Sequence, residues 1–316
     1  MSEIRITNMH YYFHHDYYDF LEGKVERFKN YTLAQFSSEE LRENSDKKSP
    51  FIFEKKHKAI TSYSYEGISS DWIKNNINEN NMNYMQDLTG TVQYPGLLLG
   101  TWYTHSLGAK SEIVMGFSFD YVTGLPYLPG SSLKGILKDK FQYGEYILEN
   151  LKNVIKKDLP EDENKKNEEI DLIMKELIKA IFGDENVPGT DVFMDSYIQS
   201  KENKNILKMD YLAPHNQEMN KTSDQETKSN PDKKKKLFDV NVLTMIRVAP
   251  DTKINLNFIL KDSSIKEIKN KDGIIILNSF VLEKDVKLAL FKQILSDFGI
   301  GAKTNVGYGN LVFEWI

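Results

Sequence analysis

Residues 299–309 read GIGAKTNVGYG, and they connect a predicted helix to a predicted strand. The helix covers residues 284–298, in which the apolar side chains at four-residue spacing are Val286, Leu290, Ile294 and Phe298. The strand covers residues 311–315. Four glycines in eleven residues lose much conformational freedom on folding, so the loop must need special backbone angles or a close backbone approach. Gly299 is also accounted for as the C-cap of the helix.

The side chains of this loop argue against a nucleotide-binding P-loop. The run from Gly301 to Thr304 resembles one, but Ala302 stands directly before Lys303, where a P-loop has glycine. A P-loop also follows a strand and opens a helix, which is the reverse of the order here. Thr304 likewise breaks the glycine pattern of dinucleotide-binding proteins. The loop instead offers a charge and a hydroxyl to phosphate, and Tyr308 offers a ring on which a base can stack.

A second candidate phosphate-binding stretch, PGSSLKG, occupies residues 129–135. Ser131 or Ser132 is expected to cap a helix, and a helix N-terminus attracts phosphate through its unsatisfied N–H groups. The groups expected to contact phosphate are Gly130, Ser131, Ser132, Lys134 and Lys138, of which the two lysines lie one helical turn apart. The alternative is an ordinary capped helix with solvated lysines.

The order of predicted elements indicates an α+β protein with a ferredoxin-like, or split βαβ, arrangement and helical and loop insertions. Apolar residues alternate at 113–119, as in a strand with one buried face. The remaining predicted elements are a helix from 131 toward 152 with a break at Gly144, further helix within 152–179, strands at 191–195, 240–248 and 254–260, and the final helix and strand.

Two parts of the chain lack this regular pattern. Residues 1–95 are expected to form a helical and irregular extension packed on a core domain of residues 96–316, with one short helix around 38–42. Residues 216–236 are almost entirely polar and end in four lysines, so we expect a mobile insertion.

Composition limits the classes of function. The 316 residues carry a net charge of −5, which argues against nucleic acid wrapped over the whole surface but allows a local basic groove. The absence of cysteine excludes disulfides and thiolate metal sites and fits a cytoplasmic protein. The longest apolar runs are too short to span a membrane. We expect no cofactor and no metal.

The two loops, in this order and separation, resemble the RAMP superfamily of CRISPR ribonucleoprotein subunits. Residues 127–135 are similar to the signature at the family's first helix, and residues 299–309 are similar to its C-terminal glycine-rich loop. Residues 192–196 and 209–215 are similar to segments of subunit six of type III-B (Cmr) complexes. The resemblance covers about residues 95–316, and the insertion at 216–236 departs from it.

The resemblance implies a modified RRM-like fold and a non-catalytic backbone subunit that serves antiviral defence. Such a subunit would hold guide RNA toward its 3′ portion, help to position target RNA and contact neighbouring RAMP subunits, while another subunit cuts the target. Phosphate and sugar contacts suit a guide of variable sequence. The expected RNA-binding residues are Gly130, Ser131, Ser132, Lys134, Lys138, Arg247, Gly301, Lys303, Thr304, Asn305, Gly307 and Tyr308.

Other interpretations stay open at this point. The chain can instead be a RAMP endoribonuclease, with or without a metal, that uses His14, His15 or His215 as a general base. Asp191, Asp195 and Asp210 are the candidate metal ligands, whereas His105 is expected to be a structural hydrogen-bonding residue. Arg247 is either paired at a sheet edge or directed at RNA. A structural adaptor that binds no RNA is the third class.

Overall fold

The computed structural model describes residues 6, 8–17, 49–63, 84–101, 105, 112–155, 163–199, 205–212 and 243–313. The chain divides into two compact units. The first unit comprises residues 1–65, 98–125 and 204–248, and the second comprises residues 66–97, 126–203 and 249–316. The expected helix around 38–42, the insertion at 216–236 and His215 lie outside the described residues.

The second unit is built on an antiparallel sheet with the strand order β12-β1-β7-β4-β2, in which β3 also pairs with β7. Its strands are β1 (Met85–Val92), β2 (Tyr127–Leu128), β3 (Val192–Phe193), β4 (Ser196–Gln199), β7 (Lys253–Ile259) and β12 (Leu311–Phe313). β7 is central because it pairs with β1 along one edge and with β3 and β4 along the other. Its residues from 254 onward are all buried, as expected for a strand covered on both faces.

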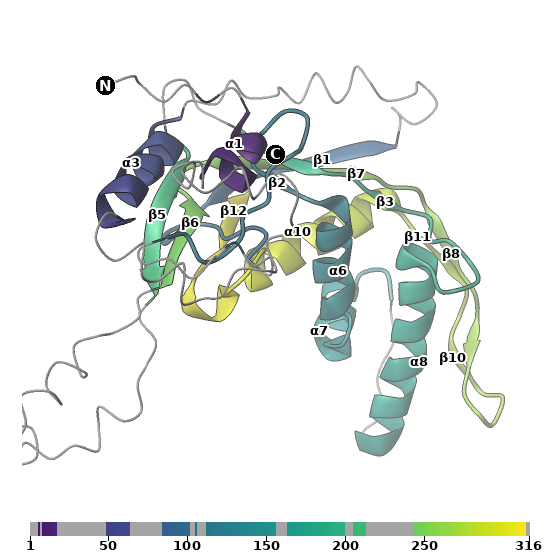
Figure 1. Cartoon of the computed structure of the whole chain (residues 1–316). Coiled ribbons are helices and arrows are strands. Elements are labelled where there is room, and N and C mark those ends of the chain that lie inside the picture. The colour runs from purple at the N-terminus through teal and green to yellow at the C-terminus, as the bar shows by residue number, and fades with distance from the viewer. Residues whose placement is uncertain are drawn as a thin grey trace, which may run out of the picture. The chain divides into compact units, whose positions relative to one another are not determined.

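Helices cover one face of this sheet (Figure 1). They are α6 (Gly130–Lys140), α7 (Gly144–Asn150), α8 (Glu163–Phe182) and α10 (Lys284–Phe298). α8 buries an apolar stripe at helical spacing that includes Ile170, Ile173, Met174, Leu177 and Ile181. Phe182, Phe193, Phe258 and Phe291 bring α8, β3, β7 and α10 together, with neighbouring ring centroids 5.5–6.0 Å apart.

The order β1, α6 to α8, β3 and β4, β7, α10, β12 is the β-α-β-β-α-β order of a ferredoxin-like fold. This confirms the predicted fold class but corrects its first strand. Residues 113–119 form no continuous strand; Ile113 makes one isolated parallel bridge with Thr244. The true first strand, MQDLTGTV, buries only Leu88, Gly90 and Val92, so its apolar alternation is too weak to detect.

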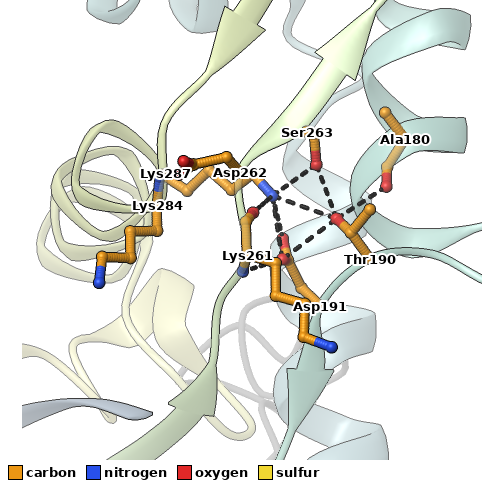
Figure 2. Close-up of polar contacts among 8 residues, drawn as sticks. All are labelled: Ala180, Thr190, Asp191, Lys261, Asp262, Ser263, Lys284 and Lys287. Atoms are coloured by element: carbon orange, nitrogen blue, oxygen red, sulfur yellow. Dashed lines mark hydrogen bonds and ion pairs between the residues drawn. The ribbon is translucent and has the colours of Figure 1, made fainter. Parts of the chain in front are cut away.

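A buried ion pair fixes the start of α10 (Figure 2). The ammonium group of Lys287 lies 2.8 and 2.9 Å from the two carboxylate oxygens of Asp191, and neither side chain is exposed. The Lys261 carbonyl oxygen at 2.6 Å and the Ser263 and Thr190 hydroxyls at 2.6 and 3.2 Å share the three N–H donors of this ammonium with Asp191. These contacts join α10 to the segment that follows α8 and to the end of β7.

Four short strands between β7 and α10 form an extended hairpin that lies along α8 (Figure 1). β8 (Ser263–Ile265) pairs with β11 (Phe280–Leu282), and β9 (Ile268–Lys269) pairs with β10 (Ile275–Leu277). Lys271 at the turn forms an ion pair with Glu168 of α8 at 3.1 Å. Because these strands are short and pair separately, no long run of alternating apolar residues indicated them in the sequence.

The described residues of the first unit include two helices and a two-stranded ladder. The helices are α1 (Met9–His14) and α3 (Ser49–Ser62), and the ladder pairs β5 (Leu207–Leu212) with β6 (Leu243–Val248). The Tyr17 hydroxyl accepts a hydrogen bond from the Ile113 N–H at 2.8 Å and lies 2.9 Å from Nε2 of His57 on α3. Phe13 stacks on His105 with ring centroids 3.8 Å apart.

The proposed division at residue 95 stays a prediction. Helices α1 and α3 lie before residue 95, and so does β1, which belongs to the sheet of the second unit. Among the described residues, no helix combines the length and the apolar character needed to cross a membrane.

Candidate nucleic-acid interface

The first turn of α6 differs from the predicted phosphate cradle. Its N-cap is Pro129, which provides no side-chain capping hydrogen bond, so the expected serine cap is wrong. The N–H of Gly130 donates to the Asp195 carboxylate at 2.7 Å. A Cβ at Gly130 would lie 2.1 Å from the Phe193 carbonyl oxygen, so glycine is required here by packing against β3. Asp195 therefore already places a negative charge at this helix end.

The exposed face of α6 presents the polar groups that the sequence indicated. Ser131 and Lys138 are exposed, and Ser132 and Lys134 are half-buried. Lys134 and Lys138 are separated by one turn, and neither forms an ion pair with a described residue. These two ammonium groups are available for an external anion.

The glycine-rich loop has the left-handed backbone that four glycines predicted. The φ angles are 70° at Gly299, 78° at Gly301, 94° at Gly307 and 75° at Gly309. The loop closes on itself, because the Ile300 N–H donates to the Gly309 carbonyl at 2.9 Å. The Gly309 N–H in turn donates to the Gly96 carbonyl at 2.8 Å, which fixes the loop to the segment after β1.

The loop turns most of its predicted contact residues outward. Gly301, Lys303 and Asn305 are exposed, and Thr304 and Gly307 are half-buried. Lys303 itself has a left-handed φ of 60° and precedes the 3₁₀ turn η5 (Thr304–Val306). The prediction for Tyr308 is corrected: its side chain is only 7% exposed, so the ring packs in the core rather than offering a stacking surface.

The loop begins beside the C-terminal end of α6. The ring of Phe298, the residue before Gly299, stacks on Tyr143 at 5.4 Å and lies 5.1 Å from the Lys140 ammonium. The first turn of α6 lies instead against β3. Because an α-helix rises about 1.5 Å per residue, the two ends of α6 are about 15 Å apart. The two loops therefore flank α6 and do not form one compact pocket.

Arg247 belongs to the first unit, whereas the other candidate RNA-binding residues belong to the second. Its Nε is 2.7 Å from the Asp210 carboxylate, across the β5–β6 ladder. Of the two expectations for Arg247, pairing within the sheet is the one that the structure shows.

The residues considered for a metal or a nuclease centre have other contacts. Asp191 pairs with Lys287, Asp195 accepts from Gly130, and Asp210 pairs with Arg247. The described part of the chain contains no group of three or more His, Cys, Asp or Glu residues placed to hold a metal.

Neither His105 nor His14 has the properties of a general base. The ring nitrogens of His105 lie 3.0 and 2.7 Å from the carbonyl oxygens of Ile113 and Phe13, as expected for a structural residue. Burial lowers the pKa of His14 to about 4, although part of this side chain is exposed, so the imidazole is a weak base near neutral pH.

Sequence comparison identifies the family. A model of the RAMP superfamily matches residues 88–312. The chain belongs to the RAMP superfamily. The matched region of this RAMP protein starts within β1 and includes both candidate loops. A search of curated proteins found no match.

Comparison with solved structures identifies similar chains, one of them with a TM-score of 0.50. A chain from the structure of the type III-B Cmr-beta bound to cognate target RNA is 16% identical, with a TM-score of 0.50. The similarity covers 94% of this RAMP protein and 88% of that chain. Cmr6 from Pyrococcus furiosus is 20% identical over 74% of this RAMP protein and 100% of its own chain, with a TM-score of 0.37.

Two groups that shape this surface were not predicted from the sequence. Asp195 was considered only as a metal ligand, yet it occupies the N-terminus of α6. Lys140 was not considered, yet it lies over Phe298 and next to the glycine-rich loop. The only sequence signal for the role of Asp195 was its negative charge, since acidic side chains are stabilising near helix N-termini.

Proposed function

We propose that this RAMP protein is a non-catalytic backbone subunit of a type III-B CRISPR ribonucleoprotein. It holds guide RNA toward the 3′ portion, helps to position target RNA for antiviral defence and contacts neighbouring RAMP subunits. The proposal is carried by three lysines on α6 and the adjoining glycine-rich loop that form no ion pair with any acidic residue in the described part of the chain. They are Lys134, Lys138 and Lys303. The Cmr-beta structure, which contains target RNA, supports the class of partner.

In this proposal the RNA backbone follows the exposed face of α6. The Ser131 hydroxyl and the ammonium groups of Lys134 and Lys138 contact successive phosphates, and the strand then reaches Lys303 and Asn305 of the loop. In this proposal side chains, and not the N-terminus of α6, bind the phosphates. The Asp195 carboxylate already accepts a hydrogen bond from the Gly130 N–H, and its negative charge repels phosphate at this end of the helix. Contacts to phosphate and ribose do not depend on base identity, as a variable guide requires.

The glycine-rich loop contributes through its shape. The left-handed glycines fold it into a tight turn that holds Lys303 and Asn305 outward. Gly301, which is exposed, leaves room for a ribose or phosphate to lie close to the backbone. A pre-shaped loop loses little entropy on binding, so each of its hydrogen bonds contributes more to affinity.

The alternative function is a RAMP endoribonuclease that acts on repeat RNA. A general base is most effective when its pKa is near the working pH, whereas the pKa of His14 is about 4. His105 contacts two carbonyl groups, and the three candidate aspartates are engaged. The described residues therefore favour the binding function.

The binding function is tested with the reconstituted effector complex and labelled guide RNA. Changing both Lys134 and Lys303 to Ala is expected to weaken guide binding by about 5- to 30-fold, since each hydrogen bond from an ammonium group to phosphate contributes on the order of 1 kcal/mol. The slope of log Kd against log salt is expected to fall by about 0.7 for each phosphate that the protein no longer neutralises, the value for a single strand. Unchanged affinity together with an unchanged slope would contradict the role of these lysines.

Lys271→Ala is the matched control for charge. Lys271 is an exposed lysine of the same unit, at the turn between β9 and β10, and it already pairs with Glu168 of α8. Its removal is expected to leave guide affinity unchanged. The nuclease alternative is tested by incubating the purified chain with repeat RNA, with and without EDTA. Site-specific cleavage that His14→Ala abolishes would replace the binding proposal.

A further inference from the structure

A cluster of aromatic rings lies on the surface of the first unit, whereas the lysines assigned above belong to the second unit. Its members, named here the α1 platform, are His10, Tyr11, His14, His15 and Tyr121. Tyr121 is 77% exposed and Tyr11 is 56% exposed. His14 and His15 are also exposed, and His10 is half-buried. A cluster of solvent-exposed aromatic side chains indicates an interaction site more often than single exposed rings do.

The rings of the platform form two adjoining pairs on α1. Tyr11 and His15 stack with centroids 4.7 Å apart and planes 21° apart. His10 and His14 lie 4.6 Å apart, and Tyr121 meets His10 edge-on at 5.2 Å. The i and i+4 spacing of each pair places both pairs along the same short helix. The result is a row of ring faces and edges rather than a pocket.

The platform is held rigidly before any partner arrives. The Asn8 side chain accepts from the Tyr11 N–H at 3.0 Å and donates to the carbonyls of Tyr121 and Val122 at 3.2 and 3.1 Å. His10 Nδ1 lies 3.0 Å from the Phe119 carbonyl. Gly124 has a φ of 70°, and a Cβ there would lie 2.6 Å from the Met9 nitrogen, so the turn fits closely against α1. Such a preformed surface has little ordering cost on binding.

Helix α3 of the same unit carries cationic side chains and contacts α1. The Lys56 ammonium is 5.4 Å from the ring centroid of Tyr12 on α1 and donates to the Asp16 carbonyl. Lys55 and Lys58 are exposed on the same helix, where Glu54 is the exposed acid. Basic side chains beside exposed rings are the combination that single-stranded nucleic acid recognises, since its phosphates and bases need both.

We propose that the α1 platform stacks on unpaired bases of a single-stranded RNA while the lysines of α3 contact its phosphates. Tyr and His rings are among the side chains on which unstacked bases lie in RNA complexes. Among the described residues, the platform has a single strongly exposed aliphatic neighbour, Val122, whereas a protein-docking patch needs a broader apolar centre. The low pKa of His14 keeps its ring uncharged near neutral pH, as suits stacking.

This surface extends the proposed function without depending on Lys134 or Lys303. The proposed function supplies only the class of partner, RNA. Failure of the guide-binding proposal can be distinguished from failure of the platform proposal, because each surface has its own variants. Guide binding is tested with lysines of the second unit, and the platform is tested with tyrosines of the first unit. Binding by the platform, like the proposed phosphate contacts, does not depend on the base sequence of the RNA, since every base has a face that can stack.

The test measures binding of a fluorescein-labelled oligouridylate RNA to the full purified chain by anisotropy. The double variant Tyr11→Ala/Tyr121→Ala is expected to weaken binding by about tenfold or more. The slope of log Kd against log salt is expected to stay unchanged, because stacking releases no counterions. Lys55→Ala/Lys58→Ala is expected to lower that slope instead. Both tyrosines are exposed, so the variants should fold, which circular dichroism verifies.

Controls separate stacking from other causes. Tyr11→Phe/Tyr121→Phe keeps the ring faces and should retain the affinity. Tyr94→Ala removes a comparably exposed ring, 81% exposed, from the second unit and should have no effect. RNA duplexes, whose bases are already stacked, should bind the double Ala variant and the unchanged chain equally.

Two outcomes would overturn the proposal. The first is an oligouridylate affinity that the double Ala variant leaves unchanged. The second is that the double Ala variant keeps its oligouridylate affinity but no longer assembles with the protein subunits of the effector complex. That result would identify the platform as a protein-docking surface.

Discussion

At the scale of single residues, the glycine-rich loop tolerates little change at Gly309. A Cβ there would lie 1.8 Å from the Ile300 carbonyl oxygen, and φ is 75°. Changing Gly309 to Ala is expected to lower the free energy of unfolding by about 3 kcal/mol or more, because the loop must open to admit the methyl group. Urea denaturation followed by tryptophan fluorescence measures the change.

Gly135 provides the contrasting substitution. It lies inside α6 with no atom within 4 Å of a Cβ. Changing Gly135 to Ala is expected to raise the free energy of unfolding by about 0.5–1 kcal/mol, the usual cost of glycine in a helix. A loss of stability in Gly135→Ala would contradict the open space at that position. Unchanged stability in Gly309→Ala would contradict the close contact with the Ile300 carbonyl.

Lys287 and Asp191 form a pair in which neither partner can be removed alone. Lys287→Met leaves a buried carboxylate without its counter-charge and is expected to lower stability by about 3–5 kcal/mol. The double variant Lys287→Met/Asp191→Asn should recover part of this loss, because no net charge is then buried. Thermal unfolding of the three proteins measures both effects, and equal melting temperatures for the two variants would contradict the coupling.

At the scale of elements, the packing of α3 in the first unit depends on a neutral histidine. Burial raises the pKa of Tyr17 well above its usual range, so its hydroxyl keeps its proton and donates it to His57 Nε2. Burial also lowers the pKa of His57 to about 4. Protonation of His57 would remove the acceptor of this hydrogen bond.

The sign of the pH effect follows from these two states of His57. Between pH 6.5 and 4 the unfolded chain binds a proton at His57 that the folded chain does not, so stability is full above pH 6.5 and falls as the pH decreases. The loss from His57 at pH 5 is on the order of 2 kcal/mol or less. His57→Gln should reduce the difference in urea midpoint between pH 7.5 and pH 5, and an unchanged difference would contradict it.

The elements differ in how well sequence alone predicted them. The bounds of α10 agree with the prediction because its apolar stripe is regular and Gly299 ends it. β1 was missed because Gly90 occupies one of its three buried positions. The serine cap was wrong because Asp195, distant in sequence, binds the first turn. Tyr308 was misplaced because periodicity does not show which side of an irregular loop faces the core.

At the scale of the whole molecule, binding through phosphates predicts indifference to guide sequence. Guides of unrelated sequence and equal length should bind the reconstituted complex with Kd values within roughly threefold of one another, because backbone contacts carry no sequence information. Competition between labelled and unlabelled guides measures this ratio. A preference well beyond tenfold for one guide would show that base edges are read.

The two units are interleaved along the chain, and this has a consequence for synthesis on the ribosome. All three stretches of the first unit lie before residue 249, so this unit is fully translated while the last stretch of the second is still missing. β1 pairs with β7 and β12, both of which come after residue 252. Until they emerge, β1 has both hydrogen-bonding edges bare, and nascent chains stalled there should be prone to aggregation or chaperone capture.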